Sequence, residues 1–212
     1  MRITDVTRSD GGNEYTVRDE TGSKYIISAG DLKRLEIPFT GREEAYPIDV
    51  PEEIREKLVF VSDKLRCIKY IQWYISGYGE KSIKRLIEKC RENGYSSECA
   101  ESATELLCRF RVIDEIASCE RRIVSYANEK LYGKYRIRQE LSAKGYRRES
   151  IDEAMETCEI DFYENAAKMY AKLTKRGIPQ DIHEKKKIAD KMVRYGYSFD
   201  EIKYAASCEY ED

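Results

Sequence analysis

The sequence predicts a mainly α-helical protein, in which three tandem three-helix repeats follow a small β-rich N-terminal element. Strand-type residues are confined to residues 1–50, and helical periodicity with a single further proline, Pro179, follows Pro51. A Gly-Tyr pair then recurs twice at intervals of 51 residues. Units of this size are too small to be very stable alone, so we expect the helix-turn-helix-like repeats to form an elongated, curved array.

The first 50 residues contain short apolar stretches separated by Asp-rich and Gly-rich turn signals. Ile3, Val17 and Ile27 lie in these stretches. The pattern predicts two or three short antiparallel strands, and residues 28–32 are expected to begin a short helical turn. This segment is therefore predicted to be the only β-rich part of the chain.

A helix is predicted directly after Pro51, which suits the first helical turn. Its apolar residues recur every three or four positions, which places them on one helix face. They are Ile54, Leu58, Val61, Leu65, Ile68, Ile71 and Ile75. Gly77 and Gly79 are expected to end the helix.

The internal repeat is centred on Gly94, Gly145 and Gly196. Apolar residues stand four and eight positions before each glycine, and further small or apolar residues stand six and nine positions after it. This pattern predicts two helices joined by a glycine that adopts positive φ. Ser96 and Ser198 are expected to cap the second helix of their pairs, whereas the middle pair has Arg147 at this position and needs a different cap.

A further helix is predicted ahead of the second and third pairs, over residues 114–131 and 161–176. The expected boundaries follow from these positions. They are 1–50 for the N-terminal element, 51–112 for the first repeat, 113–160 for the second and 161–212 for the third.

The composition excludes several classes of protein. Charged residues make up 37% of the chain against a usual quarter, and the formal net charge is −2. No apolar run approaches the roughly 20 residues of a membrane helix, and no hydrophobic leader opens the sequence. We therefore expect a cytoplasmic protein without membrane contact, and near-neutrality disfavours a protein that coats DNA unaided.

Cysteine and histidine usage predicts neither a cofactor nor a metal site. The seven Cys include no CxxC pair, and an odd number does not favour a disulfide framework, so they are interpreted as small core residues. His183 is the sole histidine and is expected at the surface. No Walker A or GxGxxG loop and no Cys-His or Ser-His pairing is evident, so an enzyme is not indicated.

Residues 133–146 of the second repeat read Gly-Lys-Tyr-Arg-Ile-Arg-Gln-Glu-Leu-Ser-Ala-Lys-Gly-Tyr. This segment resembles the RecX family of bacterial recombination regulators, which carries Gly-x-x-Arg-Ile/Leu-x-x-Glu-Leu-x-x-Lys-Gly-Ile/Val at this place. Residues 112–115 are similar to its Leu-Ile-Asp-Asp turn, with Glu115 in place of the second Asp. The first repeat matches weakly, because it lacks the Glu expected before Leu86, and the third keeps little beyond the repeat frame.

This resemblance implies a non-enzymatic negative regulator of the RecA recombinase. Such a protein binds the RecA filament on single-stranded DNA and inhibits its extension, its ATPase and its recombination activity. A monomer is the default expectation, and weak contact with single-stranded or duplex DNA stays open. The alternatives are a direct DNA-binding helical-repeat protein that acts without RecA, and a helical scaffold for another partner.

The candidate partner-binding residues lie where the charge is concentrated. Residues 116–150 carry nine basic and four acidic side chains, whereas residues 1–50 and 151–212 are net acidic. Arg beside Tyr is typical of interface anchors and of stacking on unpaired bases. The candidates are Arg121, Arg122, Lys134, Arg136, Arg138, Lys144, Arg147 and Arg148.

Overall fold

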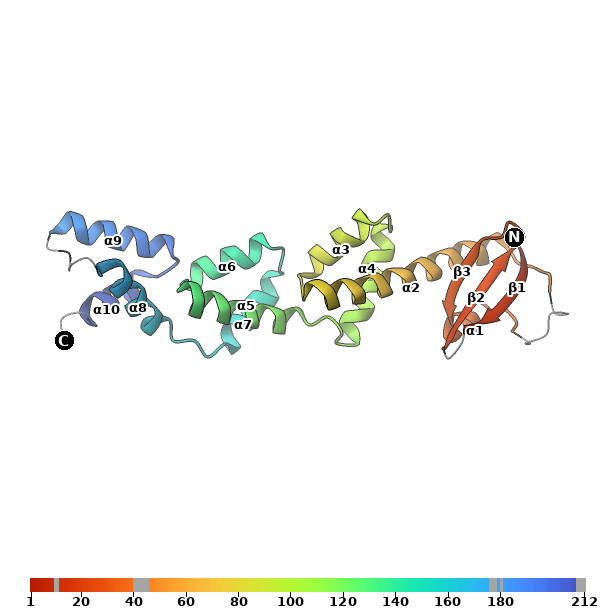
Figure 1. Cartoon of the computed structure of the whole chain (residues 1–212), viewed down its shortest axis with the longest axis horizontal. Helices are drawn as coiled ribbons and strands as arrows, with labels where there is room; N and C mark the ends of the chain where they lie inside the picture. Colours follow the sequence, from red (N-terminus) through yellow and green to blue (C-terminus); the bar gives the residue numbers. More distant parts are fainter. Residues whose placement is uncertain (10–11, 40–45, 176–178, 180, 209–212) are drawn as a thin grey trace. The chain divides into compact units, whose positions relative to one another are not determined.

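The computed structural model describes residues 1–9, 12–39, 46–175, 179 and 181–208. It is mainly helical, with a small antiparallel sheet at the N-terminus, which confirms this part of the predicted fold class (Figure 1). Among the described residues, no helix has the length and apolar character needed to cross a membrane. The curvature of the array stays a prediction.

The sheet has four strands in the order β3-β2-β1-β4. β1 (Arg2–Arg8) pairs antiparallel with β2 (Glu14–Asp19), which pairs antiparallel with β3 (Lys24–Ser28). The fourth strand, β4 (Ile48–Asp49), pairs with Arg2 and Ile3 and was not predicted. Two residues are too few to produce the alternating pattern by which a strand is recognised.

The sheet is packed against the long helix α2 (Glu52–Tyr78). Ile3, Val17 and Ile27 form one core with Leu58, and all four are fully buried. The hydroxyl of Ser62 accepts a hydrogen bond from the amide of Ile26 at 3.0 Å. The short helix α1 (Ala29–Arg34) begins at the predicted place, and Ser28 caps it.

Two glycines near the end of α2 behave differently. Gly77 lies inside the helix, whereas Gly79 ends it with φ 70°, so the prediction that both glycines end the helix is wrong for Gly77. The helices α3 (Ile83–Glu92) and α4 (Ser97–Arg109) follow, and the structure confirms Ser96 as the N-cap of α4.

Two further sets of three helices follow α4. They are α5 (Glu115–Lys130), α6 (Lys134–Ala143) and α7 (Arg148–Thr157), then α8 (Phe162–Thr174), α9 (Ile182–Arg194) and α10 (Phe199–Cys208). Asp114 and Asp161 are the N-caps of α5 and α8, so these helices begin where predicted; residue 176, the predicted end of α8, lies outside the described residues. The predicted repeat boundaries stay predictions.

The three repeat glycines adopt the predicted backbone conformation. Gly94, Gly145 and Gly196 have φ of 88°, 82° and 92°, values that glycine adopts without steric cost. The hydroxyl of Ser198 accepts from the amide of Glu201, whereas Arg147 makes no side-chain capping bond. The difference in capping expected for the middle pair is therefore confirmed.

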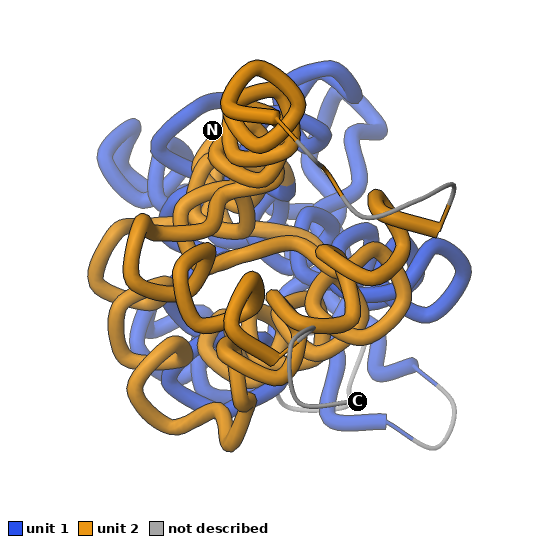
Figure 2. The backbone as a smooth tube through the Cα atoms, turned by 90° about the vertical axis from the view of Figure 1, so that its left-hand side faces the viewer, with its two compact units in different colours: residues 1–80, 86–113 blue, residues 81–85, 114–212 orange. Residues whose placement is uncertain are grey.

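Packing divides the chain into two compact units, which Figure 2 shows in separate colours. Unit 1 comprises Met1–Glu80 and Leu86–Ile113. Unit 2 comprises Lys81–Arg85 and Asp114–Asp212. The N-terminal sheet and α2 therefore belong to the same unit.

Two backbone-directed contacts within unit 2 repeat at the 51-residue spacing. The Ser82 hydroxyl donates to the carbonyl oxygen of Lys144 at 2.7 Å. Fifty-one residues further along, the Gly133 amide donates to the carbonyl oxygen of Tyr195 at 2.8 Å. In both cases, the residue that precedes a helix donates a hydrogen bond to the carbonyl oxygen of the residue that precedes a turn glycine.

All seven cysteines are free, and four of them are fully buried: Cys67, Cys90, Cys99 and Cys119. The interpretation as small core residues is confirmed for these four, whereas Cys108, Cys158 and Cys208 are only partly buried. The expected surface position of His183 is confirmed as well, because its side chain is exposed at the start of α9.

We expect the buried Cys119 thiol to make unit 2 less stable at alkaline pH. Burial, assisted by the nearby Glu115 carboxylate, raises the pKa of Cys119 to about 12. An unfolded thiol ionises near pH 8.5, so the stabilising contribution is complete below that pH and is lost as pH rises toward 12.

Chemical denaturation of the wild type and a Cys119→Ala variant at a series of pH values measures this effect. The free energy of unfolding should fall more steeply with pH in the wild type, because the variant has no thiol at this position. Equal pH slopes in the two proteins would show that Cys119 does not contribute.

Candidate partner-binding surface

The predicted basic residues lie on a core formed by α5, α6 and α7. Ile123 on α5, with Ile137 and Leu141 on α6, is fully buried there. Ile151 on α7 completes one side of the same core. The core fixes the turn between α6 and α7, where three of the eight candidate cations stand.

Those three cations are Lys144, Arg147 and Arg148. Lys144 is the C-cap of α6, Arg147 is the N-cap of α7, and Arg148 is the first residue of α7. The side chain of Arg148 is 90% exposed and that of Arg147 is 61% exposed. Gly145 lies between Lys144 and Arg147, so all three cations stand at the short turn from α6 to α7.

A buried carboxylate holds Arg147 in place. The Glu115 side chain is only 2% exposed, and its Oε2 lies 2.8 Å from Nε of Arg147. The same oxygen accepts the Ser150 hydroxyl at 2.9 Å, while Oε1 accepts the Ile83 amide at 2.9 Å. Glu115 therefore contacts the first residue of α3, the first turn of α7 and the N-cap residue of α7.

Arg138 and Arg148 share one carboxylate. Nη1 of Arg138 bonds Oδ1 of Asp152, and Nε of Arg148 lies 3.6 Å from Oδ2 of the same residue. Arg138 is only 42% exposed, so it is held against α7 more closely than Arg148. The structure thus brings α6 and α7 together through Asp152 and leaves Arg148 as the more available of the two cations.

The candidates on α5 and at the start of α6 have mainly internal contacts. Nε of Arg122 donates to the buried Tyr146 hydroxyl at 2.7 Å, and Nη2 of Arg136 lies 2.6 Å from Oε1 of Glu140. The ammonium of Lys134 lies 5.2 Å from the centre of the Phe162 ring. Arg121 is exposed on α5. Arg122 and Arg136 are therefore held by neighbouring side chains rather than directed outward.

The sequence reasoning missed one cation at the same turn. A Cβ atom built on Gly145 would lie 3.2 Å from Cδ of Lys84 and 3.2 Å from the Ser82 hydroxyl, so Lys84 runs along the turn. Its side chain is exposed. The sequence indicated Lys84 only indirectly. Finding it would have required the knowledge that the start of α3 contacts the turn between α6 and α7. We call Lys84, Lys144, Arg147 and Arg148 the basic turn.

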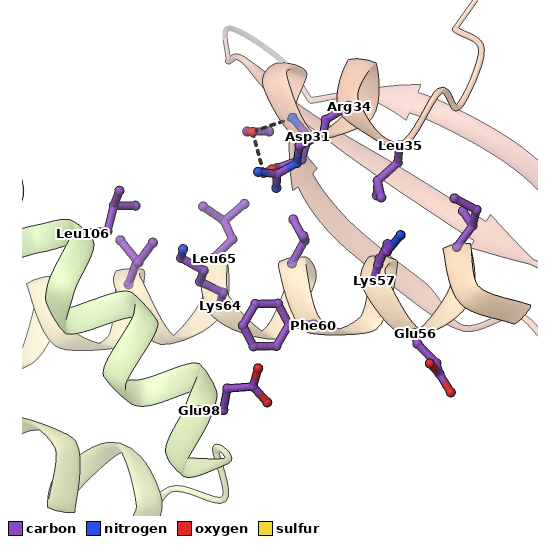
Figure 3. A pocket seen from close by; sticks show the side chains of 14 residues that line it. Asp31, Arg34, Leu35, Glu56, Lys57, Phe60, Lys64, Leu65, Glu98 and Leu106 are labelled. Atoms are coloured by element: carbon purple, nitrogen blue, oxygen red, sulfur yellow. Dashed lines mark hydrogen bonds and ion pairs between the residues drawn. The ribbon is translucent and has the colours of Figure 1, made fainter.

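Unit 1 has a separate hollow between α1, α2 and α4, with a volume of about 950 Å³ (Figure 3). Its apolar lining includes Phe60, Leu65 and Leu106. The charged lining residues are three basic and three acidic side chains, namely Arg34, Lys57, Lys64, Asp31, Glu56 and Glu98. These side chains give the lining no formal net charge.

Solved protein structures share this fold, among them the following two. A crystal structure of regulatory protein RecX superposes with a TM-score of 0.72 over 95% of this chain and 98% of that chain, at 19% sequence identity. The crystal structure of RecX from Lactobacillus salivarius superposes with a TM-score of 0.62 over 68% of this chain and 95% of that chain, at 20% identity. The chain therefore has the fold of these two RecX structures.

Sequence comparison gives the family. A regulatory protein RecX of Stenotrophomonas maltophilia is 31% identical over 133 residues, which are 63% of this chain and 81% of that protein. The chain belongs to the RecX family of regulatory proteins. A RecX of Salmonella paratyphi B is 38% identical over 81 residues, which are 38% of this chain and about half, 49%, of that relative. No family model matches the sequence.

Proposed function

We propose that this protein is a non-enzymatic negative regulator of the RecA recombinase. It binds the RecA filament on single-stranded DNA and inhibits filament extension, ATP hydrolysis and recombination. Membership of the RecX family, whose members are named regulatory proteins, is the observation that carries this proposal. The exposed cations of the basic turn supply a surface for an acidic patch of the filament.

The test is RecA's ATPase on single-stranded DNA in the presence of the full chain. We expect substoichiometric amounts to lower the hydrolysis rate, because one bound regulator stops the extension of a whole filament. An unchanged rate at several salt concentrations would reject the proposal.

The double variant Lys84→Glu/Lys144→Glu should weaken this inhibition. Both lysines are exposed at the basic turn, so charge reversal replaces attraction by repulsion without removing a buried contact. The concentration that halves the ATPase rate should rise by roughly ten-fold, which corresponds to one or two interface charges.

Lys172→Glu/Lys203→Glu is the matched control, because it changes the same charge on exposed positions of α8 and α10. Equal inhibition by the two double variants would exclude the basic turn from the interface. Arg136 and Arg138 are unsuitable for charge reversal, since a glutamate there would face Glu140 or Asp152 and disturb the fold.

A second candidate function is direct DNA binding without RecA. The position of the basic turn between two helices favours it, because helix-turn-helix proteins contact phosphates in this way. This function predicts steeply salt-dependent binding of duplex DNA by the chain alone. A gel-shift series with and without RecA separates it from filament regulation.

A further inference from the structure

A cluster of five aromatic rings lies on unit 1. Tyr70, Trp73, Tyr74 and Tyr78 stand on one face of the C-terminal half of α2, and Tyr95 follows α3. Neighbouring ring centres are 5.0–6.2 Å apart, which is the usual range for interacting aromatic side chains. We call these five residues the aromatic face.

The aromatic face is exposed and yet held in place. Trp73 and Tyr78 are each 61% exposed, an unusual environment for large aromatic side chains. The Tyr70 hydroxyl accepts a hydrogen bond from the Asn93 amide group at 2.6 Å, and the Tyr70 ring packs against Tyr95. The rings are thus ordered before any partner arrives, which reduces the entropy that binding would cost.

Helix packing does not require these rings. The residues 51 positions after the four ring-bearing residues of α2 are Arg121, Val124, Ser125 and Glu129 on α5, and none of them is aromatic. Tyr95 also differs from its counterparts. The hydroxyls of Tyr146 and Tyr197 bond to Ser118 and the Leu131 carbonyl from buried positions, whereas Tyr95 is only half-buried.

The charge of the surrounding sequence favours an acidic partner. The unit 1 residues 64–80 and 86–91 carry five basic and two acidic side chains. Arg66, Lys69 and Arg91 are exposed, and the first two also form ion pairs with Asp63 and Glu14. Aromatic rings among basic side chains are characteristic of proteins that bind single-stranded nucleic acid, because bases stack on the rings while cations contact phosphates.

We propose that the aromatic face binds single-stranded DNA by stacking unpaired bases on Trp73 and its neighbouring tyrosines. The choice of DNA over RNA rests on the proposed function, since stacking alone does not distinguish the two. Duplex DNA is a poor fit, because its bases are already stacked and paired. The contact is separate from the basic turn, which lies on unit 2.

Trp73 is the sole tryptophan of the chain, so its fluorescence reports directly on this surface. We expect an oligodeoxythymidylate to quench this fluorescence saturably without RecA present. The affinity should fall steeply with added salt because phosphate contacts release counterions. Duplex DNA of the same length should quench much less.

Variants measured with a dye-labelled oligonucleotide complete the test. Trp73→Ala should raise the Kd roughly ten-fold, the change expected for losing one stacked base, and Trp73→Phe should restore most of the affinity. Phe199→Ala is the control, because Phe199 is 79% exposed on α10 but lies outside the aromatic face. Circular dichroism of each variant checks that it folds.

Three results would overturn the proposal: no quenching by the oligonucleotide, equal affinities of the Trp73→Ala and Phe199→Ala variants, or equal quenching by duplex DNA. A Trp73 response to RecA alone, without one to the oligonucleotide, would assign the aromatic face to a protein contact instead. Because these assays contain no RecA unless it is added, their outcome is independent of the ATPase test.

Discussion

The Gly133→Ala variant is expected to lose about 3 kcal/mol of folding free energy, the upper part of the range for overpacking in a rigid environment. A Cβ atom at this position would lie 2.3 Å from the carbonyl oxygen of Gly196 and 2.7 Å from the Tyr197 nitrogen. Both are backbone atoms that cannot rotate away. The φ of Gly133 is −78°, which any residue adopts, so the predicted loss comes from this close approach alone.

Chemical denaturation followed by circular dichroism measures the loss. Trp73 lies in unit 1, so its fluorescence followed in parallel should change less than the circular dichroism signal. Gly77→Ala is the control with opposite sign, because Gly77 is inside α2 and a Cβ there would have no neighbour within 4 Å. It should be neutral or stabilise by up to about 1 kcal/mol. Equal stabilities of the two variants would contradict the structure.

The second large effect is expected for Glu115→Ala, at about 3 kcal/mol. Removing this carboxylate leaves the Ser150 hydroxyl and the Ile83 amide without their acceptor in a buried environment. It also leaves Arg147 without the partner that positions it. The loss should therefore exceed that from removing a surface ion pair.

Arg147→Ala tests this reasoning, because Arg147 is mostly exposed and its deletion keeps both buried hydrogen bonds to Glu115. The Glu115 carboxylate then keeps both hydrogen bonds but loses its counter-charge, so we expect a smaller loss of about 2 kcal/mol. Hydrogen exchange provides a second measurement: the Ile83 amide should exchange faster in Glu115→Ala than in Arg147→Ala. Matching losses in the two variants would mean that the ion pair, rather than the buried donors, determines the stability.

The features that depend on local sequence could be predicted. The turn glycines and the cap at Ser96 follow from backbone preferences within a few residues, and the 51-residue spacing located them. The helices capped by Asp114 and Asp161 also begin where predicted. The strand β4 could not be found in this way, because it exists through its pairing with β1 rather than through its own pattern.

The candidate surface was predicted less well than the fold, because a list of cations does not reveal their partners. The carboxylate that holds Arg147 is 32 residues earlier in the chain, and the Asp152 carboxylate that binds Arg138 is on the following helix, α7. Lys84 became a candidate for partner binding only because the structure places it beside Gly145. Long-range pairing of this kind depends on tertiary packing, which periodicity does not encode.

The two carbonyl contacts at the turns have a consequence for protein engineering. The accepting oxygens of Lys144 and Tyr195 belong to the main chain, so neither hydrogen bond requires a particular side chain at these two positions. The Tyr195 ring is partly buried and packs against Tyr132, whereas the Lys144 side chain is exposed. The side chain of Lys144 can therefore be exchanged while its carbonyl contact with Ser82 is kept, which makes this turn a place to introduce new binding specificities.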